Sequence, residues 1–126
     1  MTANRVKSAS NLRQIGQMCA LYSNENNGKY PPDLATGAQA ENLVPQVLRS
    51  PVGTAPDGQD YVYLHFNGMS NTVSADYIVA YDAGALEEDE GTNVLYGDGH
   101  VDWLPREAFD AALVKNKELQ KQLEKP

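Results

Sequence analysis

The first part of the chain has the hydrophobic pattern of an amphipathic helix. Four residues recur at spacings of three and four and form one apolar stripe: Leu12, Ile15, Cys19 and Tyr22. Asn27-Gly28 provides a natural stop, because glycine adopts the left-handed conformation that ends a helix, and Tyr30-Pro31-Pro32 prevents a restart. The pattern predicts a helix over residues 4–26, in which Cys19 is a buried structural thiol rather than a reactive one.

The middle of the chain changes to a strand pattern after a segment punctuated by glycine and proline. In that segment we expect one short helix near residues 38–48, followed by a loop. Four runs rich in β-branched and aromatic side chains then predict strands: residues 61–66, 76–81, 93–96 and 100–104. Gly97-Asp98-Gly99 separates the last two runs and suits a tight antiparallel hairpin.

The end of the chain returns to a helical pattern. Pro105 suits the first turn of a helix, where its missing N–H costs nothing, and Phe109 and Leu113 give that helix an apolar face. We expect this helix over residues 105–124. Residues 1–126 are thus expected to form one α+β domain, with a long N-terminal helix packed on a small antiparallel sheet of three or four strands (residues 61–104) and a C-terminal helix.

Composition limits the classes of function. The 126 residues suffice for one domain with one modest core, and Lys+Arg 10 against Asp+Glu 17 gives a formal net charge of −7. That charge argues against nucleic acid or an anionic membrane surface as partner. The single cysteine excludes an internal disulfide and a cysteine-based zinc site. No stretch approaches the roughly 18–20 apolar residues of a membrane span.

The negative charge is concentrated in the middle of the chain. Residues 50–105 contain ten acidic side chains and no lysine or arginine, so this block has a formal charge of −10. Its densest part, residues 83–91, is expected to be a loop between two strands. Calcium takes about six to eight oxygens from carboxylates and carbonyls, so this acidic loop is a candidate calcium site. The other interpretation is a charged loop that is simply solvated.

A second candidate site is the alternation of Asp98, His100 and Asp102 along one strand. A carboxylate that holds one histidine tautomer is a component of acid–base catalysis. No serine, cysteine or second histidine nearby in the sequence completes a reactive set, and the chain has no phosphate-binding glycine loop or nucleophile elbow. We therefore expect no enzymatic activity. The other interpretation of this group is that it lies on the surface or stabilises the turn.

Three stretches of the chain resemble type IV pilin-like proteins. Residues 10–16 (SNLRQIG), followed by Ala20-Leu21-Tyr22 and residues 27–31 (NGKYP), look like the segment just after the membrane stem of that family. Residues 76–81 (DYIVAY) resemble its sheet core, and residues 93–101 (NVLYGDGHV) resemble the hairpin of prepilin-related proteins. The chain is most similar to the pseudopilins of type II secretion, above all to the major pseudopilin.

The resemblance implies a structural, non-enzymatic subunit of a bacterial envelope filament that is involved in protein secretion. Its partners would be other pseudopilin subunits, and its soluble domain would be periplasmic. A leader and an apolar stem upstream of residue 1 would anchor the native protein in the inner membrane. The alternative is a calcium- or small-ligand-binding module of the envelope that shares the pilin scaffold.

The resemblance also bears on single positions. The acidic loop matches the place where major pseudopilins bind calcium, and Asp82, Glu88 and Asp89 are the ligands that we expect there. Two positions depart from related proteins. Glu88 stands where relatives with a His-x9-Asp-Gly pattern have histidine, and Ser50-Pro51 stands where many relatives have Cys-Pro.

Overall fold

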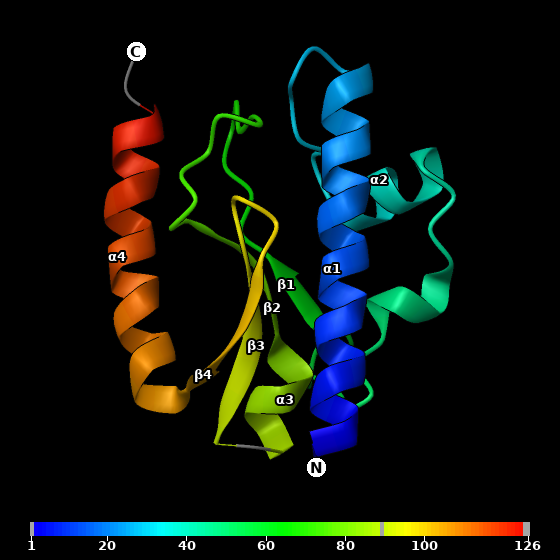
Figure 1. The fold of residues 1–126 in the computed structure, drawn as a ribbon, viewed down its shortest axis with the longest axis vertical. Coiled ribbons are helices and arrows are strands. Elements are labelled where there is room, and N and C mark those ends of the chain that lie inside the picture. Colours follow the sequence, from blue (N-terminus) through cyan, green and yellow to red (C-terminus); the bar gives the residue numbers. More distant parts are fainter. Residues whose placement is uncertain (1, 89, 125–126) are drawn as a thin grey trace.

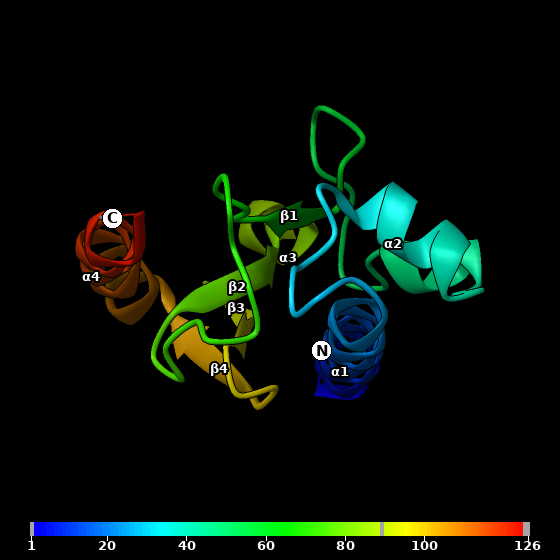
Figure 2. The same ribbon diagram turned by 90° about the horizontal axis from the view of Figure 1, so that it is seen from above.

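The computed structural model describes residues 2–88 and 90–124, and it shows an α+β domain. Its elements follow in this order: α1 (Thr2–Glu25), α2 (Leu34–Ala40), the 3-10 helix η1 (Pro45–Leu48), β1 (Tyr61–Tyr63), β2 (Ile78–Asp82), α3 (Ala83–Glu88), β3 (Gly91–Tyr96), β4 (Val101–Pro105) and α4 (Arg106–Glu124). The four strands form one antiparallel sheet in the order β1-β2-β3-β4. Helix α1 flanks the sheet on one side and α4 on the other (Figure 1; Figure 2). The predicted fold class is confirmed.

Helix α1 buries three of the four residues of the predicted apolar stripe, and the fourth, Tyr22, is half-buried. Leu12, Ile15 and Cys19 are at most 1% exposed, and they belong to the larger of two hydrophobic cores. Val79 and Leu95 bring the central strands β2 and β3 into the same core. The long helix is therefore held to the middle of the sheet by apolar packing along most of its length.

The stop signal after α1 also acts as predicted. The N–H of Gly28 donates to the carbonyl of Ser23 at 2.7 Å, which closes the last turn of the helix. Asn27 and Gly28 both have left-handed backbone angles, with φ values of 59° and 82°. Asparagine and glycine are the residues that adopt this conformation most readily, so the pair ends the helix at little cost.

The opposite face of the sheet carries the second core, which lies under α4. Its buried members are Ile78, Val94 and Phe109, and the Phe109 ring meets Tyr81 edge-on with 4.8 Å between ring centroids. Asn116 fastens the helix to β2, because its Oδ1 accepts the N–H of Ile78 at 2.5 Å and its Nδ2 donates to the Ile78 carbonyl at 3.1 Å. Both faces of the sheet are thus covered by a helix.

Two predicted elements are wrong. The single helix near residues 38–48 is replaced by α2 and η1, because Asn42 has a left-handed φ of 58° and Pro45 cannot continue an α-helix. The expected loop at residues 83–91 contains helix α3. The N–H of Ala85 donates to Oδ1 of Asp82 at 3.0 Å, so the last residue of β2 caps this helix. A Cβ at Gly84 would lie 2.1 Å from the carbonyl oxygen of Gly53, so the close packing of α3 on that loop requires glycine.

Element ends differ from the expected ones by a few residues. Strand β1 ends at Tyr63 rather than at residue 66, although the N–H of Leu64 still donates to the Val79 carbonyl at 2.8 Å. Pro105 is the last residue of β4, opposite Gly91, and α4 begins at the next residue. The missing N–H of proline is tolerated at this end of an edge strand for the same reason that it is tolerated in a first helical turn.

The burial of Cys19 predicts an inert thiol. Burial raises the pKa of this thiol to about 12 from an ordinary value of 9.0, so at pH 8 its thiolate fraction falls about a thousandfold. We expect a disulfide reagent such as DTNB to label the native chain at least a thousand times more slowly than the chain unfolded in guanidinium. Labelling of the native chain at the rate of the unfolded one would contradict this burial.

Candidate functional site

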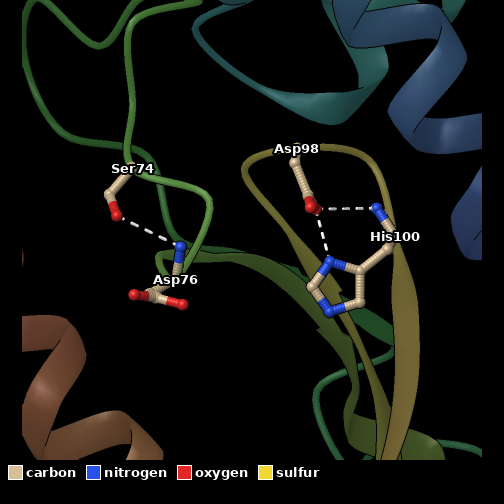
Figure 3. Close-up of polar contacts among 4 residues, drawn as sticks. All are labelled: Ser74, Asp76, Asp98 and His100. Atoms are coloured by element: carbon tan, nitrogen blue, oxygen red, sulfur yellow. Dashed lines mark hydrogen bonds and ion pairs between the residues drawn. The ribbon is translucent and has the colours of Figure 1, made fainter.

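The sequence candidates Asp98 and His100 meet in the β3–β4 hairpin. Oδ1 of Asp98 accepts the backbone N–H of His100 at 3.0 Å and also contacts Nδ1 of the imidazole (Figure 3). Gly99 stands between them with a φ of 91°, which the turn requires and glycine supplies. The His100 ring stacks on Tyr96, with 4.4 Å between centroids and 13° between planes. The carboxylate thereby fixes both the turn and the orientation of the histidine.

The third member of the predicted group lies beside this pair but has another partner. Oδ1 of Asp102 accepts the N–H of Trp103 at 3.0 Å. Asp102 and His100 line a shallow cavity of about 230 Å³ with Asp76 and Lys115, whose Oδ2 and Nζ atoms are 3.8 Å apart. The structure therefore brings the three predicted residues to one edge of the sheet, and only Asp98 contacts the histidine.

The electrostatics of the hairpin agree with a role in the turn. The pKa of Asp98 is lowered, first by the hydrogen bond from the His100 backbone N–H and then by the His100 side chain. An aspartate that accepts the N–H two residues on forms an Asx turn, which is a common way to fix a tight loop. Oδ1 of Asp98 and Nδ1 of His100 are thereby engaged in the turn.

A second polar site is buried between α1 and the sheet. Asp82 is fully buried at the end of β2, and its Oδ2 accepts hydrogen bonds from Ser8 Oγ at 2.6 Å and Ser50 Oγ at 2.8 Å. The Tyr61 hydroxyl is 3.0 Å from Ser8 Oγ. Asp60, also buried, accepts the N–H of Ser50 at 2.9 Å with its Oδ2. We call Ser8, Ser50, Asp60, Tyr61 and Asp82 the buried carboxylate cluster.

The cluster joins four segments that are distant in the sequence. Ser8 comes from α1, Ser50 from the loop after η1, Tyr61 and the preceding Asp60 from the start of β1, and Asp82 from the junction of β2 and α3. Burial raises the pKa of Asp82, and the nearby charge of Asp60 raises it further, while the bonds from Ser8, Ser50 and the Ala85 N–H oppose the rise. Burial dominates, so this carboxylate is harder to ionise than an exposed one.

The structure leaves the calcium prediction untested. Asp82 points into the buried carboxylate cluster, where Ser8, Ser50 and the Ala85 N–H occupy its oxygens. The side chain of Glu88 and the whole of Asp89 lie outside the described residues. Over residues 2–88 and 90–124, no group of three or more His, Cys, Asp or Glu side chains is arranged to hold a metal, which decides nothing about the acidic segment as a whole.

The sequence analysis missed the serines of the buried carboxylate cluster, although one of them left a signal. Ser8 stands four residues before Leu12 and so continues the apolar stripe of α1 toward the N-terminus. A hydroxyl on the buried side of a helix needs a partner, and here it bonds to Asp82. Ser50 gave no comparable signal, because it lies in an irregular loop whose path depends on tertiary packing.

Substitutions of Asp82 test the cluster. Asp82→Ala leaves two serine hydroxyls and an N–H without their acceptor, so the free energy of unfolding at pH 7 should fall by about 2–4 kcal/mol. Asp82→Asn keeps the shape and one acceptor and should cost less than about 1.5 kcal/mol. Urea unfolding followed by circular dichroism measures both, and an equal loss in the two variants would contradict the cluster.

The original chain and Asp82→Asn should also differ in how their stability depends on pH. The pKa of Asp82 is raised in the folded state, so this residue contributes stability that is fully present below its unfolded pKa and is lost as the pH rises through the folded value. Asp82→Asn cannot gain that stability in acid. The free energy of unfolding of Asp82→Asn, taken relative to that of the original chain, should therefore be highest at neutral pH. It should decrease as the pH falls toward 4.

The hairpin gives a separate test by titration. The pKa of Asp98, followed through its carboxyl carbon by NMR, should lie below the ordinary 3.8. In His100→Ala it should rise only part of the way back, because the backbone N–H of residue 100, the larger cause, is still present. A full return to the ordinary value would assign the shift to the imidazole alone.

Comparisons with known proteins return no match for this chain. No family model matches it, and neither a curated protein nor a solved structure matches it significantly. Within residues 2–88 and 90–124, none of the helices combines the length and the apolar character needed to cross a bilayer.

Proposed function

We propose that this protein is a structural subunit of a pilin-like filament in the bacterial envelope, a pseudopilin of type II secretion or of a related machine. The observation that carries the proposal is the geometry of α1. At 24 residues the helix is about 36 Å long, and it runs along the long axis of the molecule (Figure 1). One side of it is buried on the sheet, and the other side is available to other subunits.

The available side of α1 is a continuous stripe. We call it the outer face of α1, and it consists of exposed residues at helical spacing: Val6, Ser10, Arg13, Gln17 and Leu21. Val6 is 61% exposed and Leu21 is 54% exposed, so two large apolar side chains face solvent at the two ends of the stripe. The outer face carries apolar side chains at its two ends and polar or charged ones between them, and the apolar ends are suited to helix–helix contact.

Charge supports a head-to-tail contact between subunits. The acidic block at residues 50–105 contains no lysine or arginine, whereas the lysines and arginines are confined to α1, the loops between α1 and residue 50, and α4 with the residue after it. A contact between two different surfaces of identical subunits does not close and so generates a filament. In the proposal an apolar segment upstream of Thr2 continues α1 into the inner membrane, and the N-terminal end of α1 lies at the lower tip of the molecule, where such a segment could leave it (Figure 1).

The native protein provides the direct test. We would purify it from the cell envelope and determine its N-terminal sequence and mass, and we expect a processed start on an apolar stem of about 20 residues. A native protein that begins near Met1 without a stem would overturn the proposal and favour a ligand-binding module of the envelope.

A matched pair of variants tests the outer face of α1. Leu21→Asp should lower the amount of filament recovered from cells at least tenfold, because it places a carboxylate in the proposed helix contact, while the melting temperature of the domain should stay within about 2 °C. Val114→Asp, at a 63% exposed position on α4, is the control and should assemble normally. Normal assembly of Leu21→Asp, or equal loss in both variants, would contradict a contact through this face.

A further inference from the structure

Strand β1 forms an edge of the sheet and lines a groove; Tyr61 is 4% exposed, and Val62 and Tyr63 are half-buried. Its register with β2 pairs Tyr61 with Asp82 and Tyr63 with Ala80. The hydrogen bonds to β2 are made by the residues before, between and after Tyr61 and Tyr63. The N–H of Leu64 donates to the Val79 carbonyl, and the N–H of Ala83 donates to the Asp60 carbonyl. In an antiparallel pair the intervening residues direct their N–H and C=O groups away from the partner strand. The peptide groups of Tyr61 and Tyr63 therefore point outward, and no described residue is hydrogen-bonded to them.

The other edge of the sheet is protected. The same alternation directs Val101, Trp103 and Pro105 of β4 outward, because the Tyr96 N–H donates to the His100 carbonyl, and the last two of these positions are protected. The Trp103 N–H is taken by Oδ1 of Asp102 at 3.0 Å, and Pro105 has no N–H. Proteins commonly protect edge strands with proline and charged side chains in this way. Strand β1 has neither device, so its unpaired edge is a distinct feature of the fold.

The unpaired edge faces a groove. The groove has a volume of about 660 Å³, and it lies between β1 and the segments of α2 and η1 that flank it. Figure 2 shows β1 and α2 on either side of this region. Its walls are largely apolar and come from Pro32, Leu34, Pro45, Leu48 and Tyr63. A groove between a strand edge and a helix is the setting in which peptides are bound by strand addition.

The two ends of the groove carry opposite charges. Arg49 lies at the Tyr61 end, because the N–H of the next residue, Ser50, donates to Oδ2 of Asp60, the residue before Tyr61, at 2.9 Å. Asp33 lies at the other end, since the Tyr63 hydroxyl donates to the Pro31 carbonyl at 2.7 Å. Asp60 and His65 also line the groove, but Asp60 is buried and its two oxygens accept the N–H groups of Ser50 and Ala55. The exposed charges of the groove are therefore Arg49 at one end and Asp33 at the other.

We propose that this groove binds an extended segment of another protein as a fifth, antiparallel strand beside β1. An antiparallel segment runs from the Asp33 end to the Arg49 end, so charge complementarity requires a basic residue first and an acidic residue about four positions later. Alternating apolar residues between them suit the groove walls. Main-chain hydrogen bonds to Tyr61 and Tyr63 supply affinity, and the two end charges supply direction. This inference does not depend on the proposed filament.

The test uses the 126-residue chain and a capped synthetic peptide, Gly-Lys-Val-Thr-Val-Glu-Gly. Amide hydrogen exchange is followed by NMR as the peptide is added. We expect the Tyr61 and Tyr63 amides to be protected at least tenfold, while the Val62 amide, which already faces β2, is unchanged. The charge-reversed peptide Gly-Glu-Val-Thr-Val-Lys-Gly should bind at least fivefold more weakly. Absence of protection at millimolar peptide would overturn the proposal.

Two further measurements separate the possible occupants. Arg49→Glu should remove the preference for the first peptide, whereas Arg13→Glu, the same charge change on the outer face of α1, should leave binding unaltered. An equal effect of both variants would assign the binding to overall charge and would overturn the site. If the Tyr61 and Tyr63 amides become protected as the chain itself is concentrated, with no peptide present, the occupant is a second copy and the proposed peptide site is wrong.

Discussion

The carboxylate of Asp82 joins by hydrogen bonds parts of this fold that also share one apolar core. It receives hydroxyl groups from α1 and from the loop after η1, and it also caps α3. Apolar packing along α1 is tolerant of small rotations, but a buried carboxylate without its partners costs several kcal/mol. The bond from Ser8 therefore sets the rotation of α1 about its axis. That rotation decides which side chains of the helix face the sheet and which form its outer face.

The coverage of the sheet explains where partners can bind. Helices α1 and α4 cover its two faces, each over its own core, so neither face is available to another molecule. What is left for partners is the outside of the helices and the edges of the sheet. The outer face of α1 is a surface of the first kind, and the groove beside β1 is one of the second. Tyr61 contributes to the contacts behind both. The side chain of Tyr61 points toward α1, where its hydroxyl contacts Ser8, while its peptide group faces the groove.

The sequence predicted best what depends on local pattern. The stripe through Leu12 and Ile15, the stop at Asn27-Gly28 and the strand-forming runs are all readable because hydrophobic period and turn chemistry act over a few residues. Prediction from the sequence failed where a contact with a distant residue determines the local structure. Residues 83–88 are helical because Asp82 caps them and Gly53 packs on them, and the charge of the segment suggested a loop instead. Likewise, the pairing of Asp98 with His100 was predictable from their spacing, whereas the buried carboxylate cluster joins residues up to 74 positions apart.

The unequal edges of the sheet have a consequence for aggregation. A sheet that forms between molecules continues to grow only if each added molecule presents another unpaired strand edge to the next one. Here Asp102 takes the Trp103 N–H and Pro105 has no N–H, so of the outward positions of β4 only the peptide group of Val101 is left for the next chain to pair with. Strand addition at β1 is therefore not expected to propagate from one molecule to the next. An unpaired strand at one edge is compatible with a discrete complex, because the opposite edge does not extend the sheet.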